Sequence, residues 1–281
     1  ALLRKDFSER LRDELSKGLS FAVARESAAR ALIGEDAGVL AEPNDILGVE
    51  YCKALLQSDS TIMPLAMERR AVGHNEGAAG GFASASYIRA LLAGGEDASA
   101  FLTAESAAIY ARECAAGRAP VTMKGAERAM LSRLRMLEEA DFARYDSGGE
   151  GLYRRFYAAV RTAASVDELL GTVKTKRYAY ARLRRMLLAA YLDIAAAELP
   201  QEIPYLRVLA CNERGRMLLR AIKNEGSAPV LTKSADVRSL SEEAQRLFAL
   251  SARACDQYVL AYPELRAAKG GGAWTQGPVI V

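Results

Sequence analysis

Apolar residues recur every three or four positions along most of this 281-residue chain, which is the pattern of amphipathic α-helices. Near the start of the chain, the apolar positions four residues apart are Leu3, Phe7, Leu11 and Leu15. Gly18 follows them, and a glycine after the last apolar position is typical of a helix end. The pattern therefore predicts a first helix that ends at Gly18.

Three more helices and one strand are predicted before residue 100. A helix is expected from about 21 to 32, another is capped by Asn44 or Asp45, and a third begins near Ser86. The run STIMPLAMER, residues 60–69, is apolar and bounded by polar turns. Such a run predicts a short strand.

From about residue 100 the helical pattern is nearly continuous. Four stretches carry apolar residues at helical spacing, namely 126–145, 151–163, 165–173 and 182–199. The apolar stripe of the last stretch consists of Leu183, Met186, Leu187, Ala190 and Ile194.

The tail of the chain mixes helices with short strands. The runs PYLRVLAC (204–211) and SAPVLT (227–232) predict strands on either side of a helix over 213–226. Another helix is expected over 240–260, whereas residues 268–281 show no regular pattern. The predicted fold class is therefore mainly α with a few short strands.

Composition and rare residues exclude several classes of protein. Hydrophobic residues make up 51% of the chain and charged residues 26%, which is the balance of a folded globular protein. No apolar run approaches the ~20 residues of a membrane span, so we expect a cytoplasmic protein without a membrane partner. The four cysteines form no CxxC pair, so we expect no structural metal. His74 is the one histidine, which excludes motifs that need two, such as HxGH or HExxH, and we assign no catalytic residue.

A candidate phosphate site lies in ASASYIRALL, residues 83–92. Ser84 or Ser86 can cap the predicted helix, whose start carries the positive end of the peptide dipoles. Side chains lean toward the N-terminus of a helix, so Arg89 is expected to reach the same place and to offer its guanidinium to phosphate oxygens. The alternative interpretation is a well-capped helix without a ligand.

A second candidate site is the basic run KTKRYAYARLRR, residues 174–185. No acidic residue occurs from Leu169 through Leu192. Cations with interleaved aromatic rings suit a nucleic acid, because the charges meet phosphates and the rings stack on bases. The expected RNA-binding residues are Lys174, Lys176, Arg177, Tyr178, Arg182, Arg184 and Arg185. Tyr180 lies between them, and Arg154, Arg155 and Arg207 extend the patch if they fold nearby.

The order of several motifs resembles that of the bacterial tRNA(Met) cytidine acetate ligases. The resemblance runs from about Leu15 to Tyr262. The motifs that carry it are LSKGLSFAVAR, PNDILGVEYCKAL, IMPLAMERRAVGHN, SASYIRALL, EGLYRRF, KTKRYAYARLRRML and PYLRVLACNERGRMLL. The resemblance implies a Rossmann-like nucleotidyltransferase domain followed by a helical domain, which we place at residues 1–98 and 99–281.

The resemblance also implies a reaction and a set of ligands. Enzymes of this family activate acetate with ATP, which we expect to bind with Mg²⁺, and transfer the acetyl group to N4 of the wobble cytidine of elongator tRNA(Met). The implied ATP-binding residues are Asn44, Arg69, Ser84, Ser86 and Arg89. The basic run 174–185 matches a segment of the helical domain that we assign to tRNA.

The sequence departs from the family pattern in its first domain. The family begins with a strand that leads to an HxGH motif, which this sequence does not contain. We therefore expect a truncated chain with an incomplete ATP-binding domain and little ligase activity of its own. Two alternatives to the ligase reading are a non-catalytic RNA-binding helical module and a helical protein whose basic run binds an acidic partner protein.

Overall fold

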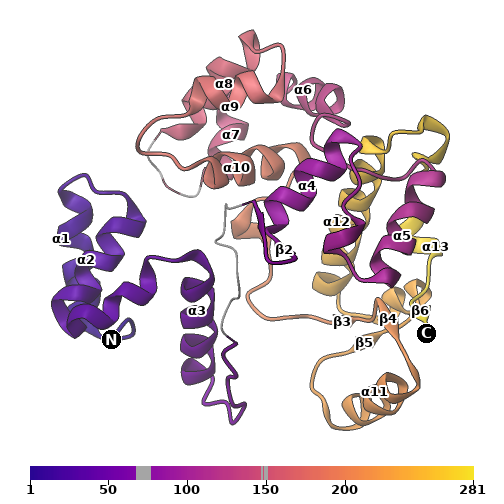
Figure 1. Ribbon diagram of the computed structural model, residues 1–281, viewed down its shortest axis with the longest axis horizontal. Helices are drawn as coiled ribbons and strands as arrows, with labels where there is room; N and C mark the ends of the chain where they lie inside the picture. The colour runs from indigo at the N-terminus through magenta and orange to yellow at the C-terminus, as the bar shows by residue number, and fades with distance from the viewer. Residues whose placement is uncertain (68–76, 147, 149–150) are drawn as a thin grey trace. The chain divides into compact units, whose positions relative to one another are not determined.

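The computed structural model describes residues 1–67, 77–146, 148 and 151–281. The chain divides into two compact units, Ala1–Phe101 and Leu102–Val281, which are described separately below (Figure 1). None of the helices in the described part of the chain has the length and the apolar composition that a membrane crossing requires.

The first unit is helical apart from one short hairpin. Its α-helices are α1 (Lys5–Ser16), α2 (Phe21–Ile33), α3 (Pro43–Gln57) and α4 (Ala85–Gly94), and its 3₁₀ turns are η1 (Gly34–Leu40) and η2 (Ser99–Phe101). The hairpin pairs β1 (Ala78–Ala79) with β2 (Phe82–Ala83). The core beneath α1 and α2 consists of Phe7, Ala28, Ala29, Ala37 and Leu40. Because three of its five members are alanines, the helices approach closely but bury little apolar surface.

Two predictions for this unit are wrong. Residues 61–67 form no strand, and the side chains of Met63, Leu65 and Met67 are 87–89% exposed. A strand needs a hydrogen-bonded neighbour, and no described segment pairs with this one. Neither Asn44 nor Asp45 caps α3, because the helix begins one residue earlier at Pro43. Proline suits the first position of a helix, where the missing N–H removes no hydrogen bond.

The second unit holds the remaining helices. Its α-helices are α5 (Ala104–Ala115), α6 (Glu127–Arg135), α7 (Glu139–Tyr145), α8 (Leu152–Thr162), α9 (Val166–Val173), α10 (Tyr180–Leu192), α11 (Glu213–Glu225), α12 (Glu242–Tyr258) and α13 (Gly272–Thr275). Its 3₁₀ turns are η3 (Ala196–Glu198), η4 (Ser234–Ser239), η5 (Val259–Ala261) and η6 (Leu265–Ala267). The predicted fold class, mainly α with a few short strands, is confirmed.

Helices α6 to α10 surround the main core of this unit. Four members of the predicted stripe on α10 are buried in this core, whereas Ile194 lies beyond the helix end and is half-buried. Two arginines join α6 to α8. Arg161 donates to the carbonyls of Arg135 (2.7 Å) and Leu137 (2.7 Å), and Arg135 donates to the carbonyl of Ala163 (2.8 Å). Each guanidinium thus binds carbonyls at the C-terminus of the other helix, where a cation is favoured.

The strands of the tail pair in parallel. β3 (Leu206–Arg207) pairs with β5 (Val230–Leu231), and β4 (Ala210–Cys211) pairs with β6 (Val279–Ile280). The strands predicted within 204–211 and 227–232 are therefore confirmed. The expectation of no regular structure over 268–281 is wrong, because this stretch forms α13 and β6. Its pairing partner lies about seventy residues away along the chain, where no local pattern can indicate it.

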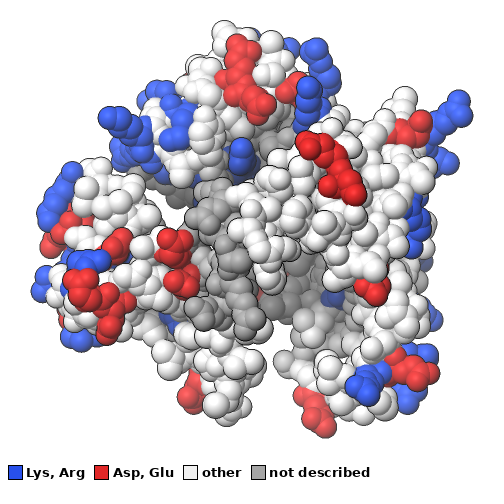
Figure 2. All heavy atoms as spheres, in the orientation of Figure 1, with Lys and Arg blue, Asp and Glu red and all other residues white. Residues whose placement is uncertain are grey.

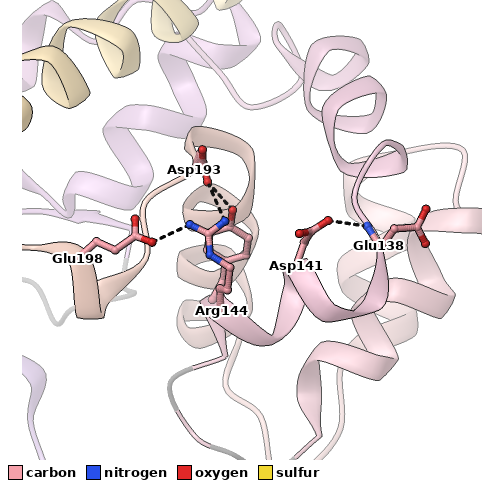
Figure 3. A network of polar contacts seen from close by, with 6 residues as sticks. Glu138, Asp141, Arg144, Asp193 and Glu198 are labelled. Atoms are coloured by element: carbon pink, nitrogen blue, oxygen red, sulfur yellow. Dashed lines mark hydrogen bonds and ion pairs between the residues drawn. The ribbon is translucent and has the colours of Figure 1, made fainter.

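A polar network joins α7 to the end of α10 (Figure 3). Glu138 and Asp141 form a capping box at the start of α7. At its other end, Arg144 lies 2.7 Å from the Glu198 carboxylate and 3.7 Å from that of Asp193, and the hydroxyl of Tyr145 donates to Asp193 at 2.6 Å. Burial and this hydrogen bond raise the pKa of Tyr145 to about 12. The same hydrogen bond lowers the pKa of the Asp193 carboxyl below its ordinary value of 3.8.

Replacing Asp193 by Asn tests this network. Asp193 has a left-handed backbone (φ 57°), which asparagine also tolerates, so the substitution changes charge rather than conformation. At pH 7 we expect Asp193→Asn to lower the free energy of unfolding by about 1 kcal/mol, a modest value because solvent screens the half-exposed carboxylate. The folded-state pKa of Asp193 is lowered, so its contribution is present above its unfolded pKa and lost as pH falls through the folded value.

Urea denaturation at pH 7 and at about pH 3 measures this difference. The deficit of Asp193→Asn should shrink at the lower pH. Tyr145→Phe removes the same hydrogen bond from the other side, so the double variant should be less destabilised than the sum of the two single variants. A deficit that stays the same at both pH values would contradict the assignment.

Candidate functional site

The start of α4 is fixed by the hairpin that precedes it. Gly80 and Gly81 both have positive φ and form the turn between β1 and β2. The backbone N–H of Ser84 then donates to the carbonyl of Gly77 at 3.2 Å. The hydroxyl of Ser84 accepts the N–H of Tyr87 at 3.1 Å, and Ser84 is only 1% exposed. Ser84 is therefore the helix cap, and its oxygen lies inside the unit.

Ser86 and Arg89 lie on the exposed side of the same helix turn. The guanidinium of Arg89 donates to the hydroxyl of Ser86 at 3.3 Å, so the arginine side chain folds back toward the helix start. Arg89 forms no ion pair with any residue that the structure describes. An exposed guanidinium without a carboxylate partner, beside a hydroxyl and the positive end of a helix, is suited to an anionic group.

The other two predicted ATP-binding residues are not brought into this cluster. Asn44 is exposed in the first turn of α3, and its side chain makes no hydrogen bond within the described residues. Arg69 lies outside the described residues. Ser84, Ser86 and Arg89 therefore form the part of the predicted site that the structure assembles.

The basic run forms the connection from α9 to α10 and the first turns of α10. Lys176, Arg177, Arg184 and Arg185 are exposed, and Lys174 and Arg182 are half-buried. Figure 2 shows Lys and Arg side chains gathered over the end of the α8–α10 region that carries this connection.

Tyr180 lies between two of these cations. The ammonium of Lys174 is 5.5 Å from the centre of its ring, and the guanidinium carbon of Arg184 is 5.8 Å from it. Both distances allow a cation–π attraction. The ring is 45% exposed, so an aromatic surface flanked by two positive charges faces solvent. Tyr180, which our list of RNA-binding residues leaves out, is thus the tyrosine of this run that can stack on a base.

The ring of Tyr178 is not accessible for stacking on a base. It is only 5% exposed and packs in the core of the second unit. Arg182 lies over its ring at 5.1 Å and 3.3 Å from the Asp146 carboxylate, which is 2% exposed and accepts the N–H of Tyr153 near the start of α8. Tyr178 and Arg182 therefore stabilise the α9–α10 connection from its buried side. The alternation of tyrosine with small residues did not reveal which ring points inward.

The arginines expected to extend the patch separate into two groups. Arg155 is exposed and donates to the carbonyl of Thr172 at 3.4 Å, two residues before Lys174, so it adjoins the basic run. Arg154 is its exposed neighbour on α8. Arg207 instead packs on the ring of Phe248 at 5.0 Å and donates to the carbonyl of Ala273, among the residues of the tail.

A cavity that sequence reasoning missed lies beside the Asp193 network. It has a volume of about 550 Å³ and is lined by side chains of both signs, including Asp193, Glu198, Glu243, Arg246 and Arg253. The end of α10, η3 and α12 contribute these residues from distant parts of the chain, so no motif indicates them. Because acids and bases both line the cavity, it favours neither an anion nor a cation.

Comparison with known proteins extends these observations. The HIGH Nucleotidyl Transferase family matches residues 2–271. The tRNA(Met) cytidine acetate ligase of Fervidobacterium nodosum is 33% identical over 251 residues, which are 87% of this chain and 59% of that protein. The protein of the same name from Acetivibrio thermocellus is 30% identical over 96% of this chain and 69% of its own length. The chain thus spans between about half and two thirds of the length of most of these relatives.

Solved structures agree with this similarity. The crystal structure of apo TmcAL from Thermotoga maritima superposes with a TM-score of 0.92 at 25% identity, over 99% of this chain and 71% of that one. TmcAL bound with alpha-thio ATP gives a TM-score of 0.90 at 26% identity, over 99% and 70%. The helical fold with few strands is therefore the fold of TmcAL. The family match and the shared length with the Acetivibrio protein together show that this chain belongs to the HIGH nucleotidyl transferases, within the tRNA(Met) cytidine acetate ligase family.

Proposed function

We propose that the chain functions in an ATP-dependent ligase reaction that acetylates a cytidine of tRNA(Met). Its relatives are named tRNA(Met) cytidine acetate ligases, and a structure of TmcAL holds alpha-thio ATP. In the proposed reaction, an acetate oxygen attacks the α-phosphorus of ATP, which gives acetyl-adenylate and releases pyrophosphate. N4 of the wobble cytidine of elongator tRNA(Met) then attacks the acetyl carbon, and AMP leaves.

The observation that carries the ATP assignment is the Arg89–Ser86 contact at the exposed start of α4. Negative charge builds up on the phosphates as pyrophosphate departs, and preorganised donors stabilise such charge. Arg89 supplies a fork of N–H donors, and Ser86 supplies a hydroxyl. Ser84 acts through its cap, which orients the first turn. Asn44 and Arg69 complete the proposed ATP set on the strength of the family motif.

Mg²⁺ is expected to enter with the nucleotide. No group of three or more His, Cys, Asp or Glu side chains in the described ranges is arranged to hold a metal ion. Mg²⁺ at nucleotide sites is commonly held by the phosphates, by water and by one or two carboxylates. The phosphates of ATP and water would therefore supply most of the ligands of this ion, and Arg89 would neutralise part of the remaining phosphate charge.

The proposed tRNA-binding surface is the exposed face of the α9–α10 connection. Its members are Lys174, Lys176, Arg177, Tyr180, Arg184 and Arg185, with Arg154 and Arg155 beside them. The cations would neutralise backbone phosphates, and the Tyr180 ring would stack on an unpaired base. Tyr178 and Arg182, also expected to bind tRNA, would act by holding this surface in place.

A non-catalytic RNA-binding module is the second candidate function. The basic surface lies wholly within the second unit, Leu102–Val281, whereas the Ser86–Arg89 cluster lies in the first. RNA binding by this surface would therefore not involve the residues of the nucleotide site. Binding of tRNA without any binding of ATP would favour this second candidate.

Replacing Arg89 by Ala tests the nucleotide site. We expect about a tenfold or greater loss of affinity for a fluorescent ATP analogue, because a charge-assisted contact to phosphate is removed. Binding of tRNA should stay within about twofold of the unsubstituted chain. Arg12→Ala, which removes an exposed arginine from α1 of the same unit, is the control and should change neither affinity. Equal loss of ATP and tRNA binding in Arg89→Ala would contradict the assignment.

Replacing Lys176 and Arg177 by Gln together tests the tRNA surface. Fluorescence anisotropy with tRNA(Met) should show about tenfold weaker binding near 0.1 M salt, and the dependence of log K on log salt should flatten by about two. The charge-matched control replaces Arg128 and Arg238, two exposed arginines of the same unit, by Gln. Equal weakening in both double variants would mean that net charge, rather than this surface, binds the tRNA.

A further inference from the structure

The tail contains two short parallel strand pairs, β3 with β5 and β4 with β6, and β3 and β4 both lie within residues 206–211. The N–H groups of Leu206 and Val208 donate to the carbonyls of Pro229 and Leu231. Further along the same segment, the carbonyls of Leu209 and Cys211 accept from the N–H groups of Val279 and Val281. Segment 206–211 therefore pairs with β5 through its first half and with β6 through its second half. Figure 1 labels these strands in the tail.

A cavity of about 600 Å³ lies beside these strands and α11. Val208 directly follows β3, Cys211 is the last residue of β4, Thr232 directly follows β5 and Ile280 is the last residue of β6, and all four line it. Helix α11 connects segment 206–211 to β5, whereas β6 follows α12 and α13. Gly277 and Pro278, which directly precede β6, also line the cavity.

Three cations surround this cavity. Arg216 and Arg220 stand four residues apart on α11, and so on the same face of the helix, and Lys233 follows β5. All three side chains are exposed, and none forms an ion pair with a residue in the described part of the chain. No acidic residue is among the lining residues of this cavity. The opening therefore selects for a negatively charged group.

The interior of the cavity is largely apolar. Val208, Leu219 and Ile280 line it together with Cys211 and the hydroxyl-bearing Thr232. A volume of this size is within the range of small-molecule sites and accommodates one nucleotide. A phosphate at the cationic rim and a base against the apolar wall would satisfy both halves of the lining.

We propose that this cavity binds one unstacked nucleotide of a single-stranded RNA segment. The inference rests on the proposed tRNA-binding function and adds to it a second RNA contact, separate from the α9–α10 connection. An RNA strand fits better than a free nucleotide because the cations are exposed at the rim, where a backbone can enter and leave. Single-stranded segments are also the parts of RNA whose bases are free to enter a protein pocket.

The thiol of Cys211 provides a direct readout of occupancy. Cys211 lines the cavity and is half-buried, whereas Cys52 and Cys255 are exposed elsewhere and serve as internal controls. A short oligouridylate is expected to slow alkylation of Cys211 by N-ethylmaleimide about tenfold without changing the other two, as measured by peptide mass spectrometry. Protection by uridine monophosphate or inorganic phosphate as strong as that by the oligouridylate would overturn the RNA assignment.

Variants of α11 test the same inference without the thiol. Replacing Arg216 and Arg220 together by Gln should weaken binding of a fluorescent oligouridylate about tenfold. The matched control replaces Arg214 and Lys223 by Gln, which removes the same charge from exposed positions of the same helix outside the cavity. Equal weakening in both double variants would overturn the inference.

Failure of this inference can be separated from failure of the proposed function. If the chain binds tRNA(Met) and the Lys176/Arg177 variant weakens that binding, the proposed surface stands. Unchanged oligouridylate binding in the Arg216/Arg220 variant would then remove the cavity alone. If no tRNA binds at all, the proposed function fails, and a protected Cys211 would still identify a site for single-stranded RNA.

Discussion

The arrangement of the basic surface depends on the burial of three side chains along the α9–α10 connection. Val173 ends α9, Tyr178 lies within the connection, and Leu183 lies in the first turn of α10, and all three are buried in one core. The exposed cations Lys176 and Arg177 lie between the first two of these buried side chains. A ligand that binds a prearranged surface loses less conformational entropy than one that must order a loop. The apolar core is thus a condition for the charge arrangement above it.

Local periodicity was enough to predict most of the long helices but not the pairing of the strands. The boundaries of α2 and α4 follow from apolar spacing and capping residues that lie within a few positions of one another. The run 60–69 has the composition of a strand, yet a strand forms only with a partner, and composition carries no information about partners. The pairing of β4 with β6 joins segments separated by several helices, which a local pattern cannot report.

The candidate sites also combine features that follow from the local sequence with features that depend on tertiary contacts. The approach of Arg89 to Ser86 was predicted because the direction of side chains on a helix is a local property. The inward position of Tyr178 was not predicted, since it depends on the core formed by helices α6 to α10. Asn44 and Arg69 match family motifs, but the described structure does not bring Asn44 to Ser86 and Arg89, and Arg69 lies outside the described residues. The cavity beside β4 and α11 has no sequence signature, because separate segments of the tail contribute to its lining.

The pairing of segment 206–211 with both β5 and β6 affects how the tail could interact with other polypeptides. β5 pairs with the backbone of this segment at Leu206 and Val208, and β6 pairs with it at Leu209 and Cys211. If β6 separated from Leu209 and Cys211, the backbone of this segment would become available for intermolecular pairing, next to the exposed apolar side chains of Leu209 and Met217. Separation of β6 would thus expose backbone carbonyls that the folded tail keeps hydrogen-bonded.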